Sequence, residues 1–210
     1  MMDLRIALPL IAVAGYLIGN FQTGLVVSRM MGTDVRAHGS GGTGATNVMR
    51  TLGWLPSALT LAGDMVKGAL AAGLGLWLGG VWGARLGGLC AVLGHNWPAL
   101  FGFRGGKGIA TTGGVILALN PIIALSLIAC QAAVLLVTHI MSVASLVSAG
   151  LYVVLTLMLH WGDWWAIGYA ALLGALAFFS HRTNIDRLAH KRENKLNFKE
   201  INDISRKKKT

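Results

Sequence analysis

The chain has 210 residues, of which 54% are hydrophobic and only 12% are charged. A soluble domain carries about 25% charged residues, so this composition excludes an ordinary soluble domain and indicates a membrane protein. The formal net charge is +10, and ten of the 18 Lys and Arg residues lie between Arg182 and Lys209.

Long apolar runs alternate with short polar segments along the chain. Because a membrane-spanning helix needs ~20 apolar residues, we predict an all-α integral membrane protein, a bundle of about seven transmembrane helices with short re-entrant or Gly-rich cytoplasmic loops. The predicted helices cover residues 6–30, 54–79, 81–97, 109–120, 122–139, 143–160 and 164–180. We expect residues 1–180 to form a single transmembrane catalytic domain. A basic cytoplasmic tail, 181–210, follows, and its start (181–193) completes the active site.

The first run, 6–30, is longer than the apolar core of a signal peptide and has no clear Ala-x-Ala cleavage site. A glycine-rich loop, Gly39–Arg50, follows it. Its four glycines let backbone N–H groups approach a ligand, and Arg50 supplies a planar guanidinium that suits phosphate or carboxylate. We interpret the loop as an anion-binding cradle rather than a flexible linker. The candidate residues in it are Gly39, Ser40, Gly41, Gly44, Thr46, Asn47 and Arg50.

The same loop contains Gly-x-Gly-x-x-Gly, with Asp64 twenty positions after its last glycine. That pattern matches a dinucleotide-binding fingerprint, which requires a preceding strand and a βαβ unit. Here it lies between apolar runs of membrane length, so we reject the dinucleotide interpretation. Asp64 and Lys67, three positions apart in the second run, share one side of a helix. They either neutralise each other and orient the bundle or take part in function directly, and the sequence leaves both open.

The third run, 81–97, ends in His95-Asn96 and leads to a second glycine-rich loop, Phe101–Gly108. Its Gly-Gly-Lys-Gly lacks the spacing of a Walker A motif, so the sequence does not support a P-loop. The candidate anion-binding residues of this region are His95, Arg104, Gly105, Gly106, Lys107, Gly108 and Thr111.

The next run, 109–120, is too short to cross a bilayer unaided at ~1.5 Å per residue, so we predict a short or partly re-entrant helix. Ser142, at the start of the sixth run, either lines the site or helps helices pack. Trp161, Trp164 and Trp165 are typical of an interfacial aromatic belt.

The third polar cluster follows the last run and contains His181, Asn184, Arg187 and Glu193. His181 and Asp186 also spell His-x-x-x-x-Asp. In another large class of glycerolipid acyltransferases this is a dyad in which the histidine is the general base and the aspartate orients it. We keep that dyad as a minor alternative mechanism.

Fixed cations, two glycine-rich loops and no paired carboxylates indicate an anionic ligand, most simply a phosphate group. We expect no metal and no cofactor, since neither the acidic residues nor the two cysteines have suitable spacing. We expect no nucleic-acid partner, because the basic tail lacks aromatic or motif support. The alternative from another functional class is a transporter or binding protein for an organic phosphate.

Orientation follows from the basic tail, which marks the cytoplasmic side and favours contact with anionic lipid over a packed core. With seven crossings the N-terminus is outside. Both glycine-rich loops and the region near Ser142 then fall inside, on one face with the tail.

Taken together, the clusters resemble the motifs of the bacterial acyl-phosphate:glycerol-3-phosphate acyltransferases (the PlsY family). Residues Gly39–Arg50 resemble Gly-Ser-Gly-Asn-x-Gly-Ala-Thr-Asn-x-x-Arg, with Gly42 in the position of the family's Asn. The other matching segments are Asp64, Lys67 and Gly68; Gly94, His95, Pro98, Phe101 and Gly105–Thr111; and His181, Asn184, Ile185, Arg187, Leu188 and Glu193. Lys191 replaces a frequent glycine.

The resemblance implies a multi-pass protein of the bacterial cytoplasmic (inner) membrane with seven helices. It also implies transfer of an acyl group from acyl phosphate to the 1-hydroxyl of glycerol-3-phosphate, giving lysophosphatidic acid and phosphate without coenzyme A, as a first step of phospholipid synthesis. On this hypothesis Ser40, Arg50 and Lys107 hold the acyl phosphate, His181, Asn184 and Arg187 hold glycerol-3-phosphate, and Glu193 orients a cation. The catalytic candidates are then Ser40, Arg50, Lys107 and His181. The general base is either His181 or the departing phosphate.

Overall fold

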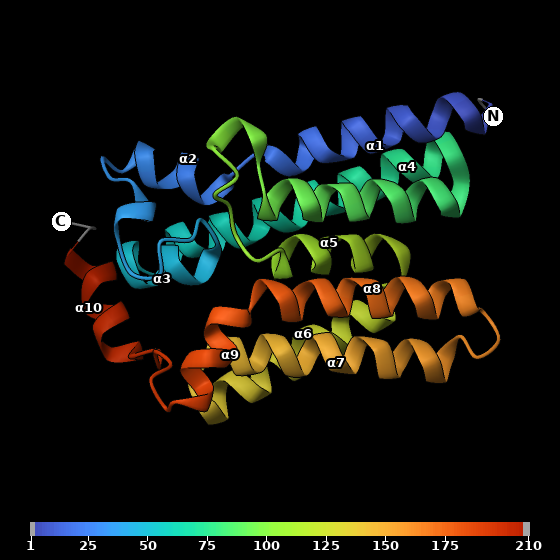
Figure 1. Cartoon of the computed structure of the whole chain (residues 1–210). Coiled ribbons are helices and arrows are strands. Elements are labelled where there is room, and N and C mark those ends of the chain that lie inside the picture. Colours follow the sequence, from blue (N-terminus) through green and yellow to red (C-terminus); the bar gives the residue numbers. More distant parts are fainter. Residues whose placement is uncertain (1–2, 208–210) are drawn as a thin grey trace. The chain divides into compact units, whose positions relative to one another are not determined.

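The computed structural model describes residues 3–207 of the chain. These residues form helices joined by turns and contain no strand, which confirms the predicted all-α class (Figure 1). The described chain forms two compact units, one from residues 3–119 and 197–207 and one from residues 120–196.

The first unit is built around one long, reversed helix. Its elements are α1 (Leu4–Asn20), α2 (Thr23–Met30), the 3-10 turn η1 (Val35–Ala37), α3 (Ala45–Leu52), α4 (Trp54–Asn96), the 3-10 turn η2 (Ala99–Phe101), α5 (Ile109–Leu119) and α10 (Phe198–Lys207). The first apolar run is thus divided at Phe21 and Gln22 into α1 and α2.

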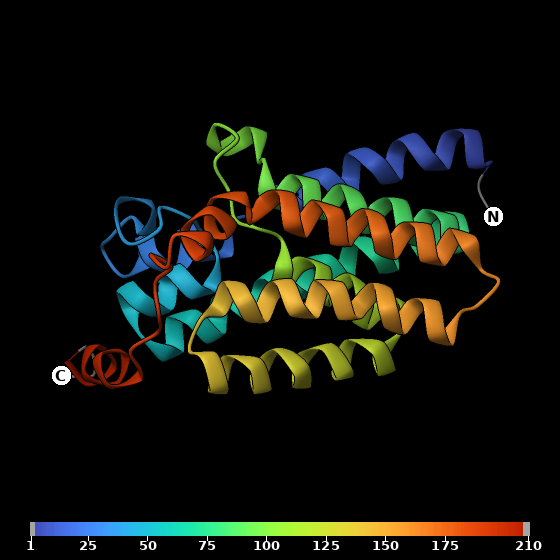
Figure 2. The ribbon, with the colours of Figure 1, turned by 60° about the horizontal axis from the view of Figure 1, so that its bottom comes forward.

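Helix α4 folds back on itself at Gly79 and Gly80, whose backbone angles are not helical; Gly80 has φ 62°. In a straight helix the rise of 1.5 Å per residue would separate Ala71 from Gly87 by about 24 Å. Here a Cβ on Gly87 would lie 2.5 Å from the Ala71 carbonyl oxygen. The segments before and after the reversal therefore form two packed antiparallel arms, which are visible in Figure 2.

Glycines bring the backbones of the first unit together. Helix α1 crosses the second arm of α4 so closely that a Cβ on Gly15 would lie 2.6 Å from the Gly87 carbonyl oxygen. A Cβ on Gly68, in the first arm, would overlap with the Thr111 carbonyl oxygen of α5. Such small-residue contacts are how membrane helices gain packing energy without a hydrophobic driving force between them.

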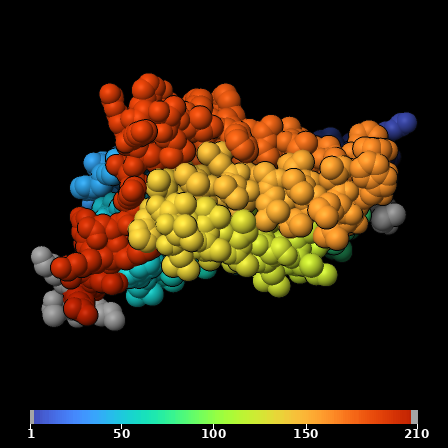
Figure 3. Space-filling model, turned by 90° about the horizontal axis from the view of Figure 1, so that it is seen from below, coloured from blue at the N-terminus to red at the C-terminus, as the bar shows by residue number. Residues whose placement is uncertain are grey.

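The second unit consists of α6 (Pro121–Thr138), α7 (Met141–Leu159), α8 (Trp164–Ser180) and α9 (Arg182–Ala189). Asn120 and Asp163 cap α6 and α8, accepting hydrogen bonds from the backbone N–H groups of Ile123 (3.1 Å) and Ala166 (3.0 Å). Helix α7 packs against both α6 and α8, and connections of a few residues make these neighbours antiparallel. Their outward side chains form adjacent yellow and orange bands in Figure 3.

Four helical segments of the described chain are long and apolar enough to cross a membrane: Leu4–Met30, Trp54–Phe101, Pro121–Thr138 and Met141–Leu159. A fifth is added if α8 and α9, bent by 60° at their junction, count as one span. Helix α5 has only 11 residues, and Trp54–Phe101 is one segment despite its reversal. The count of seven crossings therefore stays a prediction.

Helix α10 covers the corner where α3 meets α4. The ring of Phe198 stacks on Trp54 with 5.9 Å between centroids, and the Trp54 indole N–H donates to Asn202 Oδ1 at 2.7 Å. Ile201 of the same helix is buried. The positive charge of the tail predicted contact with lipid rather than a packed core. The sequence also contains apolar side chains at positions 198, 201 and 204, a helical spacing that gives α10 an apolar face. Lipid contact of the tail stays a prediction.

Candidate active site

The first glycine-rich loop is folded around the side chain of Asn47, on the first turn of α3. Its Oδ1 accepts a hydrogen bond from the Ser40 backbone N–H (2.9 Å), and its Nδ2 donates to the carbonyls of Val35 (2.9 Å), His38 (3.0 Å) and Gly42 (2.9 Å). Asn47 is buried, whereas Ser40 is exposed. The amide thus holds the loop backbone in shape beneath the Ser40 side chain.

Position 42, where this chain departs from the family pattern, has room for a side chain. A Cβ on Gly42 would be 3.7 Å from Ser40 Oγ and 4.0 Å from the Gly105 carbonyl oxygen, both ordinary contacts. Those distances also bring the two glycine-rich loops of the first unit beside each other. The loop folds here without an amide at position 42.

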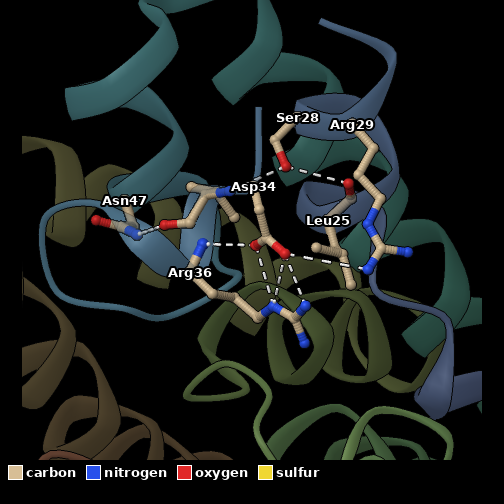
Figure 4. A network of polar contacts seen from close by, with 7 residues as sticks. Leu25, Ser28, Arg29, Asp34, Arg36 and Asn47 are labelled. Atoms are coloured by element: carbon tan, nitrogen blue, oxygen red, sulfur yellow. Dashed lines mark hydrogen bonds and ion pairs between the residues drawn. The ribbon is translucent and has the colours of Figure 1, made fainter. Parts of the chain in front are cut away.

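A second polar network supports the loop from the side of η1 (Figure 4). Asp34 caps η1 by accepting from the Arg36 backbone N–H (2.9 Å), and it pairs with the Arg36 guanidinium at 2.7 Å. Arg29 lies 4.0 Å from the same carboxylate. Ser28 Oγ accepts from the Val35 N–H at 3.3 Å and donates to the Leu25 carbonyl at 3.1 Å. These bonds hold the backbone of η1, whose Val35 carbonyl accepts a hydrogen bond from Asn47.

The hydrogen-bonded Arg36 guanidinium lowers the pKa of Asp34 from 3.8 to about 2. Because the folded pKa lies below the ordinary value, this pair stabilises the fold above pH ~4, and that stabilisation disappears as the pH falls through about 2. We expect the difference in thermal midpoint between wild type and Asp34→Asn to be largest at neutral pH and to shrink steadily as the pH falls from about 4 to 2. Unfolding followed by tryptophan fluorescence between pH 2 and 7 measures it, with exposed Asp203→Asn as control. A difference that grows on acidification would contradict the assignment.

The second glycine-rich loop lies against the end of α4. The Gly106 N–H donates to the His95 carbonyl at 3.1 Å, and a Cβ on Gly106 would overlap with His95 Nε2. His95 is buried, Lys107 is partly exposed and Arg104 is exposed. Thr111 is buried in α5, and its Oγ1 has no hydrogen-bond partner among the described residues. The buried His95 therefore packs directly against the loop that carries Lys107.

In the second unit, three predicted site residues meet at a fourth, Glu193. Its Oε1 accepts from Ser142 Oγ (3.0 Å) and Asn184 Nδ2 (2.7 Å), and its Oε2 pairs with Arg187 Nε at 2.7 Å. Burial alone would raise the pKa of this carboxyl, but the three hydrogen bonds and the Arg187 charge outweigh it and lower the pKa. The Glu193 side chain is 4% exposed and that of Arg187 34%. The carboxylate thus orients an arginine that remains accessible.

His181, at the junction of α8 and α9, is buried with Nδ1 2.8 Å from the Ala177 carbonyl oxygen. A carbonyl oxygen can only accept, so Nδ1 carries the proton, and in the neutral ring Nε2 is the acceptor. Asp186 is highly exposed and lies 3.5 Å from His190 instead. The nitrogen that an orienting aspartate would use is therefore engaged by the backbone, which argues against a His181–Asp186 dyad.

The predicted site residues thus form two sets, each described within its own unit. The first unit contains Gly39, Ser40, Gly41, Gly44, Thr46, Asn47, Arg50, His95, Arg104, Gly105, Gly106, Lys107, Gly108 and Thr111, and the second contains Ser142, His181, Asn184, Arg187 and Glu193.

Sequence reasoning missed Gln22, Ser28, Asp34 and Arg36, which support the first loop. A glutamine inside an apolar run was the one signal available for the first of them. No three His, Cys, Asp or Glu side chains within residues 3–207 gather closely enough to hold a metal ion.

Known proteins resemble the chain over most of its length. The family model for glycerol-3-phosphate acyltransferase matches residues 9–191. The glycerol-3-phosphate acyltransferase of Clostridioides difficile (strain 630) is 40% identical, covering 89% of this chain and 94% of its own. The glycerol-3-phosphate acyltransferase of Bacillus subtilis (strain 168) is 36% identical, covering 90% of this chain and 97% of its own.

A solved structure agrees with both sequence comparisons. The crystal structure of PlsY, an integral membrane glycerol 3-phosphate acyltransferase, in its glycerol 3-phosphate form superposes with a TM-score of 0.86 at 34% identity, covering 92% of this chain and 98% of PlsY. A lysophosphatidic acid form of PlsY gives a TM-score of 0.84. These similarities favour an acyltransferase over a transporter and agree with the apolar spans of the fold. The chain is a multi-pass membrane protein and belongs to the glycerol-3-phosphate acyltransferase family.

Proposed function

We propose that this protein transfers a fatty acyl group from acyl phosphate to the 1-hydroxyl of glycerol-3-phosphate, releasing lysophosphatidic acid and inorganic phosphate. The observation that carries the proposal is the pair of adjacent glycine-rich loops in the first unit. They combine backbone N–H groups with the cationic side chains of Arg50 and Lys107, as an activated phosphate group requires. The second unit offers a separate set of polar groups for a second phosphate-bearing substrate.

In the proposed reaction the hydroxyl oxygen of glycerol-3-phosphate attacks the acyl carbonyl carbon. The bond between that carbon and the bridging phosphate oxygen breaks, and inorganic phosphate leaves with the electron pair. Acyl phosphate is already activated, so positioning and charge stabilisation are the main contributions of the protein. Ser40, Arg50 and Lys107 hold the acyl phosphate, with Gly39, Gly41, Gly44, Thr46, Asn47, His95, Arg104, Gly105, Gly106, Gly108 and Thr111 shaping its site.

Glycerol-3-phosphate is held by His181, Asn184 and Arg187, and Glu193 and Ser142 orient these groups. The proton of the attacking hydroxyl passes either to the departing phosphate or to His181 Nε2. Retention of wild-type kcat in His181→Gln would assign it to the phosphate. The exposed basic residues after His181 support a cytoplasmic location for this end of the protein in a bacterial inner membrane, with the N-terminus outside.

The test uses purified protein in lipid nanodiscs, supplied with glycerol-3-phosphate and either palmitoyl phosphate or palmitoyl-coenzyme A. We expect lysophosphatidic acid and phosphate in equal amounts from palmitoyl phosphate alone. Lys107→Ala should lower kcat by about 10²- to 10³-fold, the usual loss when one group that stabilises developing charge is removed.

The matched control is Lys199→Ala, which removes an exposed lysine of the same unit and should leave the rate unchanged. Product from the thioester, or a fully active Lys107→Ala variant, would overturn the proposed donor and the role of Lys107 respectively.

A further inference from the structure

A cluster of ionisable groups lies buried in the first unit. The ammonium of Lys67, in the first arm of α4, is 2.8 Å from Asp64 Oδ1 one turn earlier and 2.7 Å from His95 Nδ1 at the end of the second arm. It also donates to the Phe21 carbonyl at 2.6 Å, at the break between α1 and α2. All three ionisable side chains are at most 5% exposed. Charged groups at such depth are costly, and where they occur they are paired or serve function.

These contacts fix the state of the imidazole. A lysine ammonium has three hydrogens and accepts none, so its contact with His95 makes Nδ1 the acceptor. The ring proton of the neutral imidazole then lies on Nε2, the atom that faces Gly106. Lys67 thereby holds His95 in one tautomer and one orientation beneath the second glycine-rich loop.

Gln22 extends the same network to the first glycine-rich loop. Its Nε2 donates to the His95 carbonyl at 3.2 Å, and its Oε1 accepts from Thr43 Oγ1 at 2.6 Å. The His95 carbonyl is also the acceptor for the Gly106 N–H. Gln22 and Thr43 are almost completely buried. One continuous chain of contacts therefore runs from the Asp64–Lys67 pair through His95 to both loops.

We propose that Gln22, Asp64, Lys67 and His95 are positioning residues that hold the two glycine-rich loops, Gly39–Arg50 and Phe101–Gly108, in the shape that binds the phosphate of the acyl donor. The inference rests on the proposed function for the identity of that donor. The network contains one cation, Lys67, and one anion, Asp64, whose charges compensate each other. The cationic side chains of the two loops therefore stay available for the ligand. None of these four side chains needs to touch the substrate.

The decisive variant is Lys67→Met, which keeps the length of the side chain and removes its charge and hydrogens. In nanodiscs we expect the KM for palmitoyl phosphate to rise about 10- to 100-fold, the usual range for a lost charged hydrogen bond. The KM for glycerol-3-phosphate should stay within about twofold, since the described contacts of Lys67 are with Asp64, His95 and Phe21 and with none of the residues proposed to hold that substrate. A purely structural role would lower the active fraction and kcat while leaving both KM values unchanged, and that result would overturn the proposal.

The double variant Asp64→Asn/Lys67→Met removes the uncompensated carboxylate that the single change leaves buried. We expect it to recover the thermal midpoint but not the KM for palmitoyl phosphate, because His95 still lacks its donor. Recovery of both would show that the pair serves only the fold. Gln22→Leu should also raise this KM. Gln131→Leu, which removes a glutamine of α6 whose contact is with Met141 sulfur, should not.

A binding measurement separates this inference from the proposed function. Dodecyl phosphate carries an alkyl chain and a phosphate but cannot transfer an acyl group. Wild type should bind it in nanodiscs, and Lys67→Met should bind it about 10- to 100-fold more weakly. If wild type fails to use palmitoyl phosphate yet this difference holds, the donor assignment fails and the positioning role stands. Equal binding by both proteins would overturn the positioning role even if the transferase reaction is as proposed.

Discussion

Replacing Glu193 with glutamine is expected to lower kcat/KM for glycerol-3-phosphate by about 10- to 100-fold, the range that corresponds to losing a hydrogen bond between charged groups. The glutamine keeps one oxygen that can accept from Ser142 or Asn184, but it removes the negative charge 2.7 Å from Arg187 Nε. The guanidinium then loses the group that orients it, and Asn184 competes for the one remaining oxygen. The effect should fall mainly on the KM for glycerol-3-phosphate.

Initial rates over a matrix of both substrate concentrations measure this effect. Glu200→Gln, a change at an exposed glutamate of α10, is the matched control and should behave as wild type. Circular dichroism and the thermal midpoint show whether the variant is folded. A folded Glu193→Gln protein with wild-type KM would contradict the role of Glu193 in orienting Arg187 for the substrate.

The second large effect is expected at Asn47, because one buried amide bonds to four backbone groups in the first loop and in the residues just before it. Asn47→Ala leaves the Ser40 N–H and the Gly42 carbonyl without a partner among the described residues, whereas the Val35 and His38 carbonyls keep their bonds from the His38 and Gly41 N–H groups. Each unpaired buried group costs about 1–3 kcal/mol, although part of that cost is recovered when the loop opens to water. We therefore expect a loss of about 2–4 kcal/mol in unfolding free energy and at least a 10²-fold fall in kcat/KM for palmitoyl phosphate.

Thr51→Ala on the same helix is the control, since it removes only a hydroxyl bond to the carbonyl one turn earlier. Asn47→Asp adds a sharper comparison: it keeps the acceptor for Ser40 but replaces the donor with a negative charge beside three carbonyl oxygens. It should be at least as damaging as alanine. If either Asn47 variant kept both stability and activity, the loop would not depend on this side chain.

The fold class could be predicted because apolar runs of membrane length have few structural solutions. The break at Phe21 and Gln22 was not predicted. Hydropathy averaged over residues 6–30 hides a single polar residue, and only the fold shows that Gln22 is buried against His95 and Thr43.

The candidate residues could be found from motif and residue type, but not the direction of each side chain. Asn47 was selected as a substrate-binding residue, and the described hydrogen bonds of its side chain all go to backbone groups of residues 35–42. Its contact with substrate stays a prediction. The Asp64–Lys67 pair was recognised as adjacent on one helix face. Its link to His95 depends on the reversal of α4, which brings positions 67 and 95 together.

Position 191 shows what a departure from a family pattern can mean physically. Lys191 has φ 55°, in the left-handed region that glycine adopts without strain. The turn it makes returns the chain from α9 so that Glu193 reaches Asn184 and Arg187. A frequent glycine here therefore reflects backbone geometry, and this chain makes the same turn with a lysine at a cost of about 1–2 kcal/mol.

The packing of α10 on the corner between α3 and α4 has a consequence for the folding of the protein during its synthesis. The hydrogen bond from the Trp54 backbone N–H to Ser205 Oγ joins residues 151 positions apart. During synthesis the whole second unit must leave the ribosome before the first unit can acquire its last helix. The second unit, a continuous segment, has no such requirement. The corner next to the first glycine-rich loop is thus among the last parts of the molecule to close, and a nascent chain cannot assemble it one helix at a time.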